Sequence, residues 1–312
     1  IFKKKRFLAD NGFSEDAHLF FYDHHYAHVL PCLFHNPEWQ DCLLYSADGG
    51  GDTGFYSFRY FNGKTIEDIF GGEEWVLKDA PIASLAFAYG TATIALGYKM
   101  NRHEGKLTGL AASGEPTLIE ALKQKFSVQD DGQIASTFTS IKDMQQYILR
   151  LCEGVAPENV AASFQQLLHV LVPQSINQLL NRYPTKNLGL SGGLFANVLL
   201  NQVIAENCPI ERIFIYPAMS DAGLSSGGAL QHLLENDGIE EWLKNRNRCK
   251  NLYLGKNYNG IIDEYFTQSD RIVKDSGEPV TQTIDALKNG DAVAIYNLGM
   301  EFGPRALGAR SV

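Results

Sequence analysis

The segment from residue 187 to residue 236 constrains the fold of this chain more than any other. It alternates apolar strand-like and helical patterns, predicted at 187–190, 195–206, 212–216 and 222–234. The turn Ser191-Gly192-Gly193 separates the first strand from the first helix. Strand, glycine turn, helix and strand in this order are typical of a parallel α/β sheet. We therefore predict an α/β fold.

The rest of the chain predicts two further regions before this segment and one after it. Residues 42–76 read as β-hairpins, with Asn62-Gly63 as a strong hairpin turn. Residues 80–182 read as mainly helical, since apolar side chains recur every three or four residues between 163 and 181. We predict a first domain over 1–245, a polar linker over 246–260 and the beginning of a second domain over 261–312.

The charge balance restricts the possible partners. Lys and Arg number 27 and Asp and Glu number 36, which leaves a net charge of −9. This argues against a broad surface for nucleic acid or anionic membranes, but not against a small anion pocket. The five cysteines are scattered without a CxxC pair, which indicates reduced thiols in a cytoplasmic protein.

Three histidines occur within the five residues from His24 to His28. On a helix, His24 and His28 lie on one face with Cβ atoms roughly 6 Å apart, so both imidazoles can reach one ion. Such a pair is a familiar metal-binding arrangement. His25 points elsewhere, either to support the site or into solvent. A polar helix start with unliganded histidines is the alternative, but the density of histidines favours a metal.

A glycine-rich turn follows the strand-like segment 43–47, with four glycines within six positions. Glycine allows close approach of a phosphate to backbone N–H groups, which makes Gly49, Gly50 and Gly51 candidate ligands. Asp48 could ligate a metal or orient a metal-bound water. Asp52 is either a turn residue or a second polar ligand. A hairpin turn without any ligand is the alternative, and the flanking aromatic strands fit it.

A second glycine turn joins the strand at 187–190 to the following helix. A glycine pair at this place suits a nucleotide, and a helix start favours an anion. The candidate residues are Ser191, Gly192, Gly193 and Asn197. The turn matches neither GxGxxG nor GxxxxGK[ST], so a Rossmann or P-loop site is not indicated. A tight strand–helix turn without a ligand remains open.

Asp221 stands between the strand at 212–216 and the helix at 222–234. It can cap that helix by accepting backbone N–H groups. It can also complete a set of two histidines and two aspartates with Asp48. Taken alone, its position favours the cap.

Two charged motifs offer further candidates. In the segment 102–110, Glu104 could act as a general base and Lys106 could neutralise a phosphate. Near the end of the chain, Arg305 and Arg310 lie beside glycines and suit a small anion such as phosphate. A solvated charged turn and surface arginines are the alternatives.

Taken together and in this order, the motifs resemble the NodU/CmcH carbamoyltransferase family, which includes the TobZ-type antibiotic carbamoyltransferases. The matching stretches lie between about residues 23 and 311 and read DHHYAH, SADGGGDTGFYSF, RHEGKLTGLAASG, LSGGLFANVLLN, YPAMSDAG and EFGPRALGARS. The resemblance implies ATPase lobes of the actin/sugar-kinase/Hsp70 (ASKHA) type, followed by the start of a YrdC-like α/β domain. It also implies that both are truncated here.

The resemblance implies an O-carbamoyltransferase. Carbamoyl phosphate and ATP give a carbamoyl-adenylate, and the carbamoyl group passes to a hydroxyl of a sugar or natural product, as in nodulation or antibiotic biosynthesis. ATP is then a co-substrate. A divalent metal is the expected cofactor, with Fe²⁺ as the family's metal and Mn²⁺, Mg²⁺ or Zn²⁺ as possibilities. The acceptor and the oligomeric state stay open.

The same resemblance assigns roles to the candidate residues. It places the metal on His24, His28, Asp48 and Asp221. The two glycine turns would contact phosphates and nucleotide, and Glu104 and Lys106 would lie near the transferred group. The general base is either Glu104 or Asp52. Arg305 and Arg310 would hold carbamoyl phosphate or ATP phosphates at the start of the YrdC-like domain.

The family begins with a strand and a phosphate loop upstream of these motifs and continues through a full YrdC-like domain. We therefore expect this chain to bind metal but not to turn over alone. One alternative is a HypF-like or tRNA threonylcarbamoyl-type enzyme, which the missing CxxC pairs and the acidic charge disfavour. Another is a non-catalytic nucleotide-binding relative, against which all four proposed metal ligands argue.

Overall fold

The computed structural model describes residues 3–72, 75, 81–256, 258, 261 and 277–312. The chain divides into two units, Ile1–Arg248 and Cys249–Val312. The division falls inside the segment predicted as a linker. Residues 257, 259–260 and 262–276, which belong to the predicted linker and second domain, lie outside the described residues.

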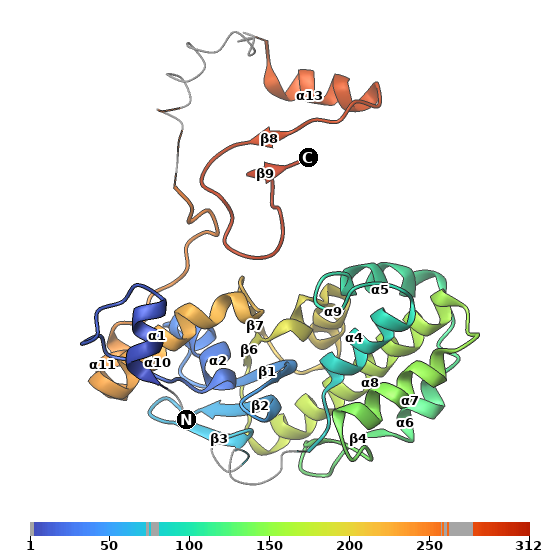
Figure 1. The fold of residues 1–312 in the computed structure, drawn as a ribbon, viewed down its shortest axis with the longest axis horizontal. Helices are drawn as coiled ribbons and strands as arrows, with labels where there is room; N and C mark the ends of the chain where they lie inside the picture. The colour runs from blue at the N-terminus through green and yellow to red at the C-terminus, as the bar shows by residue number, and fades with distance from the viewer. Residues whose placement is uncertain (1–2, 73–74, 76–80, 257, 259–260, 262–276) are drawn as a thin grey trace. The chain divides into compact units, whose positions relative to one another are not determined.

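The first unit contains one larger sheet, one small hairpin and helices on both faces of the sheet (Figure 1). Its strands are β1 (Cys42–Gly51), β2 (Gly54–Phe61), β3 (Ile66–Phe70), β4 (Phe126–Val128), β5 (Ile134–Ser136), β6 (Asn187–Ser191) and β7 (Arg212–Ile215). Its α-helices are α1 (Lys4–Asp10), α2 (His24–Phe34), α4 (Leu85–Ala95), α5 (Glu104–Leu110), α6 (Ile119–Lys123), α7 (Ile141–Cys152), α8 (Pro157–Arg182), α9 (Val198–Asn207), α10 (Leu224–Asp237) and α11 (Ile239–Lys244). Three 3₁₀ turns are η1 (Ala111–Ser113), η2 (Gly193–Ala196) and η3 (Asp221–Gly223).

The larger sheet is mixed, with strand order β3-β2-β1-β6-β7. β1, β2 and β3 pair antiparallel, whereas β1, β6 and β7 run parallel. The parallel part confirms the α/β fold predicted from 187–236. Because the carboxyl ends of parallel strands meet at one edge, the segments that follow β1, β6 and β7 gather there.

Successive side chains of β1 point to opposite faces of this sheet. Leu43, Tyr45 and Ala47 belong to the main apolar core, which includes buried residues of α4 and α8. Helices α2 and α10 pack against each other, and α2 contacts β1 and β6. On this face the side chain of Cys32 packs beside Leu44. The sheet is thus covered on both faces, and α2 lies directly against the strands that end at the site.

Most of the elements predicted for the first unit form, with three differences. The helix predicted from Phe195 begins at Val198, because a 3₁₀ turn precedes it and the Asn197 side chain caps it through the N–H of Leu200. The helix predicted from Ala222 begins at Leu224 after η3. The region predicted as mainly helical also contains the β4–β5 hairpin, whose three-residue strands are too short for a periodic pattern to reveal.

The second unit contains α13 (Pro279–Lys288) and a two-stranded sheet of β8 (Ile295–Tyr296) and β9 (Arg310–Ser311). The sequence of this region predicts a helix near 280–289 and a strand over 292–296. Helix α13 agrees with the first, while β8 is shorter than the predicted strand. Among the described residues of α13 none is buried.

None of the helices in the described part of the chain is long and apolar enough to cross a membrane.

Candidate metal centre

Helix α2 carries the first two residues of the site. Asp23 has extended backbone dihedrals and its side chain accepts the N–H of Tyr26, so it caps the helix in the way that short acidic residues favour. The helix begins at His24, which puts His24 and His28 one turn apart on the same face. Their ring centroids lie 4.8 Å apart. The predicted helical histidine pair is therefore confirmed as a pair of neighbours.

A bulge at the end of β1 presents Asp48. Ala47 pairs with Tyr56 and Gly51 with Gly54, so four steps along β1 match only two along β2. A bulge of this kind lets a strand re-aim a side chain away from the regular ladder. The Asp48 carboxylate accepts the N–H of Gly49 and the N–H of Gly193, the latter at 3.1 Å from Oδ2.

Asp221 comes from the segment between β7 and α10. Ser220, not Asp221, occupies the position before η3, and no side-chain hydrogen bond caps that turn. The cap interpretation, which the sequence alone favoured, is therefore wrong. The Asp221 carboxylate instead lies against the two histidines of α2.

The four side chains converge on one point at the carboxyl edge of the sheet. Their ligand atoms all lie within 4.8 Å of one another. His28 Nε2 is 3.2 Å from Asp48 Oδ2 and 3.5 Å from Asp221 Oδ1, and His24 Nε2 is 3.7 Å from Asp221 Oδ1. Ligand bonds of about 2.1 Å separate the donors of one ion by about 3–4 Å, which these distances match.

The site opens at one side. The side chain of His28 is 1% exposed and that of Asp48 18%, whereas Asp221 is 69% exposed. A ligand therefore has access next to Asp221, while the opposite wall is closed.

The charges of the site favour a cation. Burial and the neighbouring His28 lower the pKa of His24, and burial lowers the pKa of His25 to about 3. Burial opposes protonation of His28 too, but Asp221 and Asp48 outweigh it and raise its pKa. Burial would raise the pKa of Asp48, yet His28 and the N–H of Gly49 overcome this and lower it. Two carboxylates thus lie close together at one spot, and their negative charge favours the binding of a cation there.

A metal fits this arrangement. The ring atoms His24 Nε2 and His28 Nε2 are buried and, among the described residues, face carboxylates at 3.2–3.7 Å without forming a well-aligned hydrogen bond. Buried polar atoms without partners are rare because each costs free energy, unless a ligand satisfies it. Two imidazole nitrogens and two carboxylates also form a donor set that suits a divalent transition metal.

Several donors of the two glycine turns already have partners within the protein. The N–H groups of Gly49 and Gly193 both donate to Asp48, and the N–H of Gly192 donates to the carbonyl of Met219. The Ser191 hydroxyl also donates to Met219. These donors hold the site together, so they do not point freely at a ligand. Gly50 takes a φ of +149° within the bulge.

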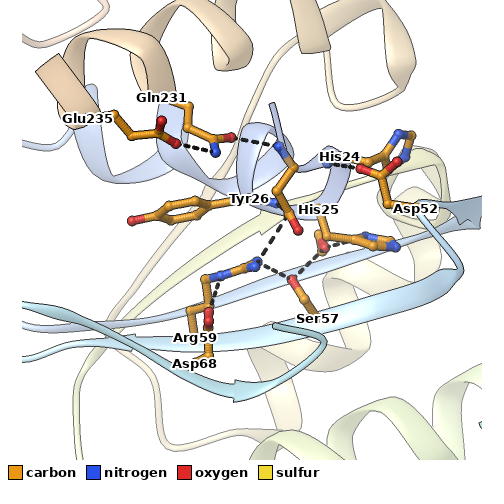
Figure 2. A network of polar contacts seen from close by, with 11 residues as sticks. His24, His25, Tyr26, Asp52, Ser57, Arg59, Asp68, Gln231 and Glu235 are labelled. Atoms are coloured by element: carbon orange, nitrogen blue, oxygen red, sulfur yellow. Dashed lines mark hydrogen bonds and ion pairs between the residues drawn. The ribbon is translucent and has the colours of Figure 1, made fainter. Parts of the chain in front are cut away.

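Asp52 lies beside helix α2, which carries the two histidines of the candidate site. It sits at the tip of the β1–β2 turn with a φ of +47°, and its Oδ2 accepts the N–H of His24 at 2.8 Å. The structure fits the turn alternative for Asp52: the residue shapes the turn, and its side chain ties the turn to α2 (Figure 2).

Among the contacts of the described residues, none joins Glu104 or Lys106 to the four residues of the candidate metal centre. Glu104 accepts the N–H of Asn101, and Lys106 lies 5.1 Å from the ring centre of Tyr98. Both contacts are local to α5 and the turn before it.

Asn197 and the C-terminal arginines also have partners or positions of their own. The Asn197 amide exchanges hydrogen bonds with Gln165 besides capping α9. In the second unit, Arg310 donates to the carbonyls of residues 297, 298 and 309 and stacks on Tyr296, with 3.5 Å between guanidinium and ring centre. Arg305 is exposed.

Sequence reasoning missed a buried polar network next to the histidines. It centres on Arg59 in β2, whose side chain is 2% exposed. The only sequence signal is a charged residue inside the aromatic strand 55–61. Strand periodicity alone would place such a residue in solvent, so this signal was easily overlooked.

Replacing Gly51 by alanine is expected to weaken metal binding about 10-fold or more, as perturbed surroundings of a metal ligand do. A Cβ at this position would lie 2.3 Å from Cγ of His24, so the ring must move. Gly49→Ala is the matched control, because its Cβ would meet no atom within 4 Å. Titration with Co²⁺ compares the two variants, and equal affinities would show that the His24 ring is not held by this contact.

Fold and site together define a mixed α/β protein with a four-residue candidate metal centre at the carboxyl edge of its sheet. The sequence matches the family model described as carbamoyltransferase N-terminus over residues 7–230. Because the match covers most of the chain, the protein belongs to the carbamoyltransferase family. This confirms the resemblance stated above.

Several proteins are similar to this chain in sequence or in structure. An uncharacterized protein of Methanocaldococcus jannaschii is 30% identical over 96% of this chain and 51% of its own length. Nodulation protein NolNO of Sinorhizobium fredii is 24% identical over 96% of this chain and 43% of that protein. Full-length HypF in its phosphate- and nucleotide-bound form is a solved structure with a TM-score of 0.48 at 14% identity, covering 72% of this chain and 46% of that chain. The chain spans about half the length of the curated relatives it matches.

Proposed function

We propose that this chain carries the metal-dependent part of an O-carbamoyltransferase. The reaction moves a carbamoyl group from carbamoyl phosphate, through an ATP-derived carbamoyl-adenylate, to a hydroxyl of a sugar or natural product. The observation that carries this proposal is the convergence of His24, His28, Asp48 and Asp221 within 4.8 Å in a member of the carbamoyltransferase family.

A divalent cation would be held by these four residues, with Fe²⁺ as the metal that the family resemblance favours. When bound, it supplies a Lewis acid that polarises a carbonyl or phosphoryl oxygen. The chain's own groups fix the geometry. Gly49 and Gly193 orient the Asp48 carboxylate through their N–H groups, and the exposed side at Asp221 leaves room for a carbamoyl donor.

The proposal extends to the two units. The first unit would be an ASKHA-type lobe, which its mixed sheet with a ligand site at the carboxyl ends of β1, β6 and β7 supports. The second would be the start of a YrdC-like domain that forms the adenylate. Nucleotide binding by the glycine turns stays a prediction, and so does the role of Glu104 or Asp52 as the general base. For Asp52 the contact with His24 favours a supporting role over proton transfer.

The test uses the full-length protein that contains this chain. It is incubated with Fe²⁺, ATP, isotopically labelled carbamoyl phosphate and a panel of hydroxylated acceptors, and mass spectrometry searches for the label on the acceptor. We expect labelled product that disappears with a chelator, and no turnover by the 312-residue chain alone. Metal-loaded full-length protein that labels no acceptor, or transfer that survives complete metal removal, would contradict the proposal.

A further inference from the structure

The guanidinium of Arg59 lies within a polar network beside the candidate metal centre and contacts Asp68, Ser57 and Asp23 (Figure 2). Its Nε donates to Asp68 at 2.6 Å and its Nη1 to Ser57 Oγ at 2.7 Å. Its Nη2 lies 3.4 Å from Asp23 Oδ1, and its Cζ lies 4.6 Å from the ring centre of Tyr26. A nearly buried cation is costly unless it is paired and hydrogen-bonded, and here each of its three nitrogens has a partner.

A chain of hydroxyls leads from Arg59 to His25. Ser57 Oγ lies 2.9 Å from Ser46 Oγ, which lies 2.8 Å from His25 Nδ1. Both serines are fully buried and the exposed fraction of His25 is 3%. Ser46 alternates to the α2 face of β1, which is why it can reach the histidine.

The donors in this chain run in one direction. Arginine only donates, so Ser57 accepts from it and has its own proton for Ser46. Ser46, which accepts from Ser57, then has its proton for His25 Nδ1. In this arrangement every hydroxyl proton finds an acceptor among the contacts of the described residues. The opposite direction would leave the proton of Ser57 without one, at a cost of about 1–3 kcal/mol. His25 Nε2 is buried and has no well-formed hydrogen bond among the described residues in either direction, so the unpaired Ser57 proton decides between them. This places the proton of His25 on Nε2.

A second arm from Arg59 reaches the first turn of α2. Asp23, which its Nη2 approaches, caps the helix through Tyr26, and the N–H of Asp23 donates to Gln231 Oε1 of α10 at 3.0 Å. Gln231 in turn donates to Glu235 at 2.9 Å. The turn that carries His24 is thus held between β2 on one side and α10 on the other.

We propose that Arg59 is a positioning residue for the metal centre, which orients the first turn of α2 through Asp23 and fixes the tautomer of His25 through Ser57 and Ser46. Partners of this kind, which contact the surroundings of a ligand and not the ion, typically change metal affinity 10–100-fold when removed. An arginine suits the role because its rigid fork serves three partners at once, which a lysine ammonium on a flexible stem does not. The proposal rests on the proposed metal site for its effect on affinity, but the tautomer of His25 does not depend on it.

Ser57→Ala is the decisive variant, because it interrupts the hydroxyl chain and leaves the contacts of Arg59 with Asp23 and Asp68. Ser175→Ala is its matched control: Ser175 is equally buried, its Oγ donates to the carbonyl of Gly132 at 2.6 Å, and it lies on α8. Nitrogen-15 NMR of the histidine rings in the metal-free chain reports which nitrogen of His25 carries the proton. We expect Nε2 in the wild type and in Ser175→Ala, and a mixture of tautomers in Ser57→Ala. A proton on Nδ1 in the wild type, or an unchanged tautomer in Ser57→Ala, would overturn the relay.

The second measurement is the Co²⁺ affinity and visible absorption spectrum of Arg59→Met, compared with Arg246→Met. Arg246 is a half-buried arginine whose donors reach the carbonyls of Trp39 and Leu243, away from the histidines. For Arg59→Met we expect 10–100-fold weaker Co²⁺ binding and a changed absorption spectrum. Arg59→Lys should recover part of the lost affinity, and Arg246→Met should bind Co²⁺ like the wild type. Equal binding in both methionine variants would refute the positioning role. Absence of Co²⁺ binding in the wild type would instead overturn the proposed metal site, while the NMR result still decides the relay.

Discussion

The double variant His24→Ala/His28→Ala is expected to lose divalent-metal binding almost completely, by more than about 100-fold, since even indirect partners of a ligand contribute 10–100-fold. The two imidazoles supply half of the four donors, and the two remaining carboxylates would face each other with no cation between them. We also expect the full-length protein with these changes to lose carbamoyl transfer. Metal analysis of purified protein and Co²⁺ titration measure the first effect.

The control for this variant is His232→Ala. His232 is an exposed histidine of α10 that contacts Asn236, so its removal changes the histidine count without touching the cluster. We expect wild-type metal content there. Full metal occupancy in the double variant would place the ion elsewhere in the protein and refute the four-residue site. Loss of metal with unchanged carbamoyl transfer would separate the metal from the reaction.

Gly192→Ala is expected to destabilise the protein strongly, by about 3 kcal/mol or more. Gly192 has φ +98° and ψ 154°, a conformation that is essentially restricted to glycine. A Cβ would also lie 2.1 Å from the carbonyl oxygen of Ala47, which belongs to the neighbouring strand and cannot rotate away. Denaturant unfolding monitored by circular dichroism measures the change.

Gly154→Ala separates the two causes of this loss. Gly154 also has a positive φ, +72°, but a Cβ there would meet no atom within 4 Å. Its replacement should cost only about 1–2 kcal/mol, the strain of a left-handed residue. Similar losses for both variants would show that the end of β6 yields to the added methyl group. Because the N–H of Gly193 holds Asp48, we expect Gly192→Ala to weaken metal binding as well.

Short-range patterns predicted much of the fold. Helix α8 follows from its three-to-four-residue periodicity, since that pattern depends on neighbours within one or two turns. The β4–β5 hairpin escaped prediction because each strand has three residues. Its existence depends on packing against the helical region and not on a local pattern.

The candidate metal ligands differ in how far the sequence alone could predict them. His24 and His28 were recognisable from their spacing, and their neighbourhood in space is a direct consequence of the helix. Asp221 was ambiguous, because a position before a helix fits a cap equally well. Only the fold shows that its carboxylate lies 3.5 Å from His28.

By itself the sequence determined most of the elements, the α/β class and the family, because these depend on local periodicity and on ordered motifs. Only the tertiary structure decided how the glycine turns and Arg59 are used. The N–H of Gly193 meets an aspartate 145 residues away, and Arg59 meets Asp23 across 36 residues. Such contacts depend on the register of β1 with β2 and β6. A shift of one residue in that register would turn Ser46 and Asp48 to the opposite face of the sheet, away from the histidines of α2.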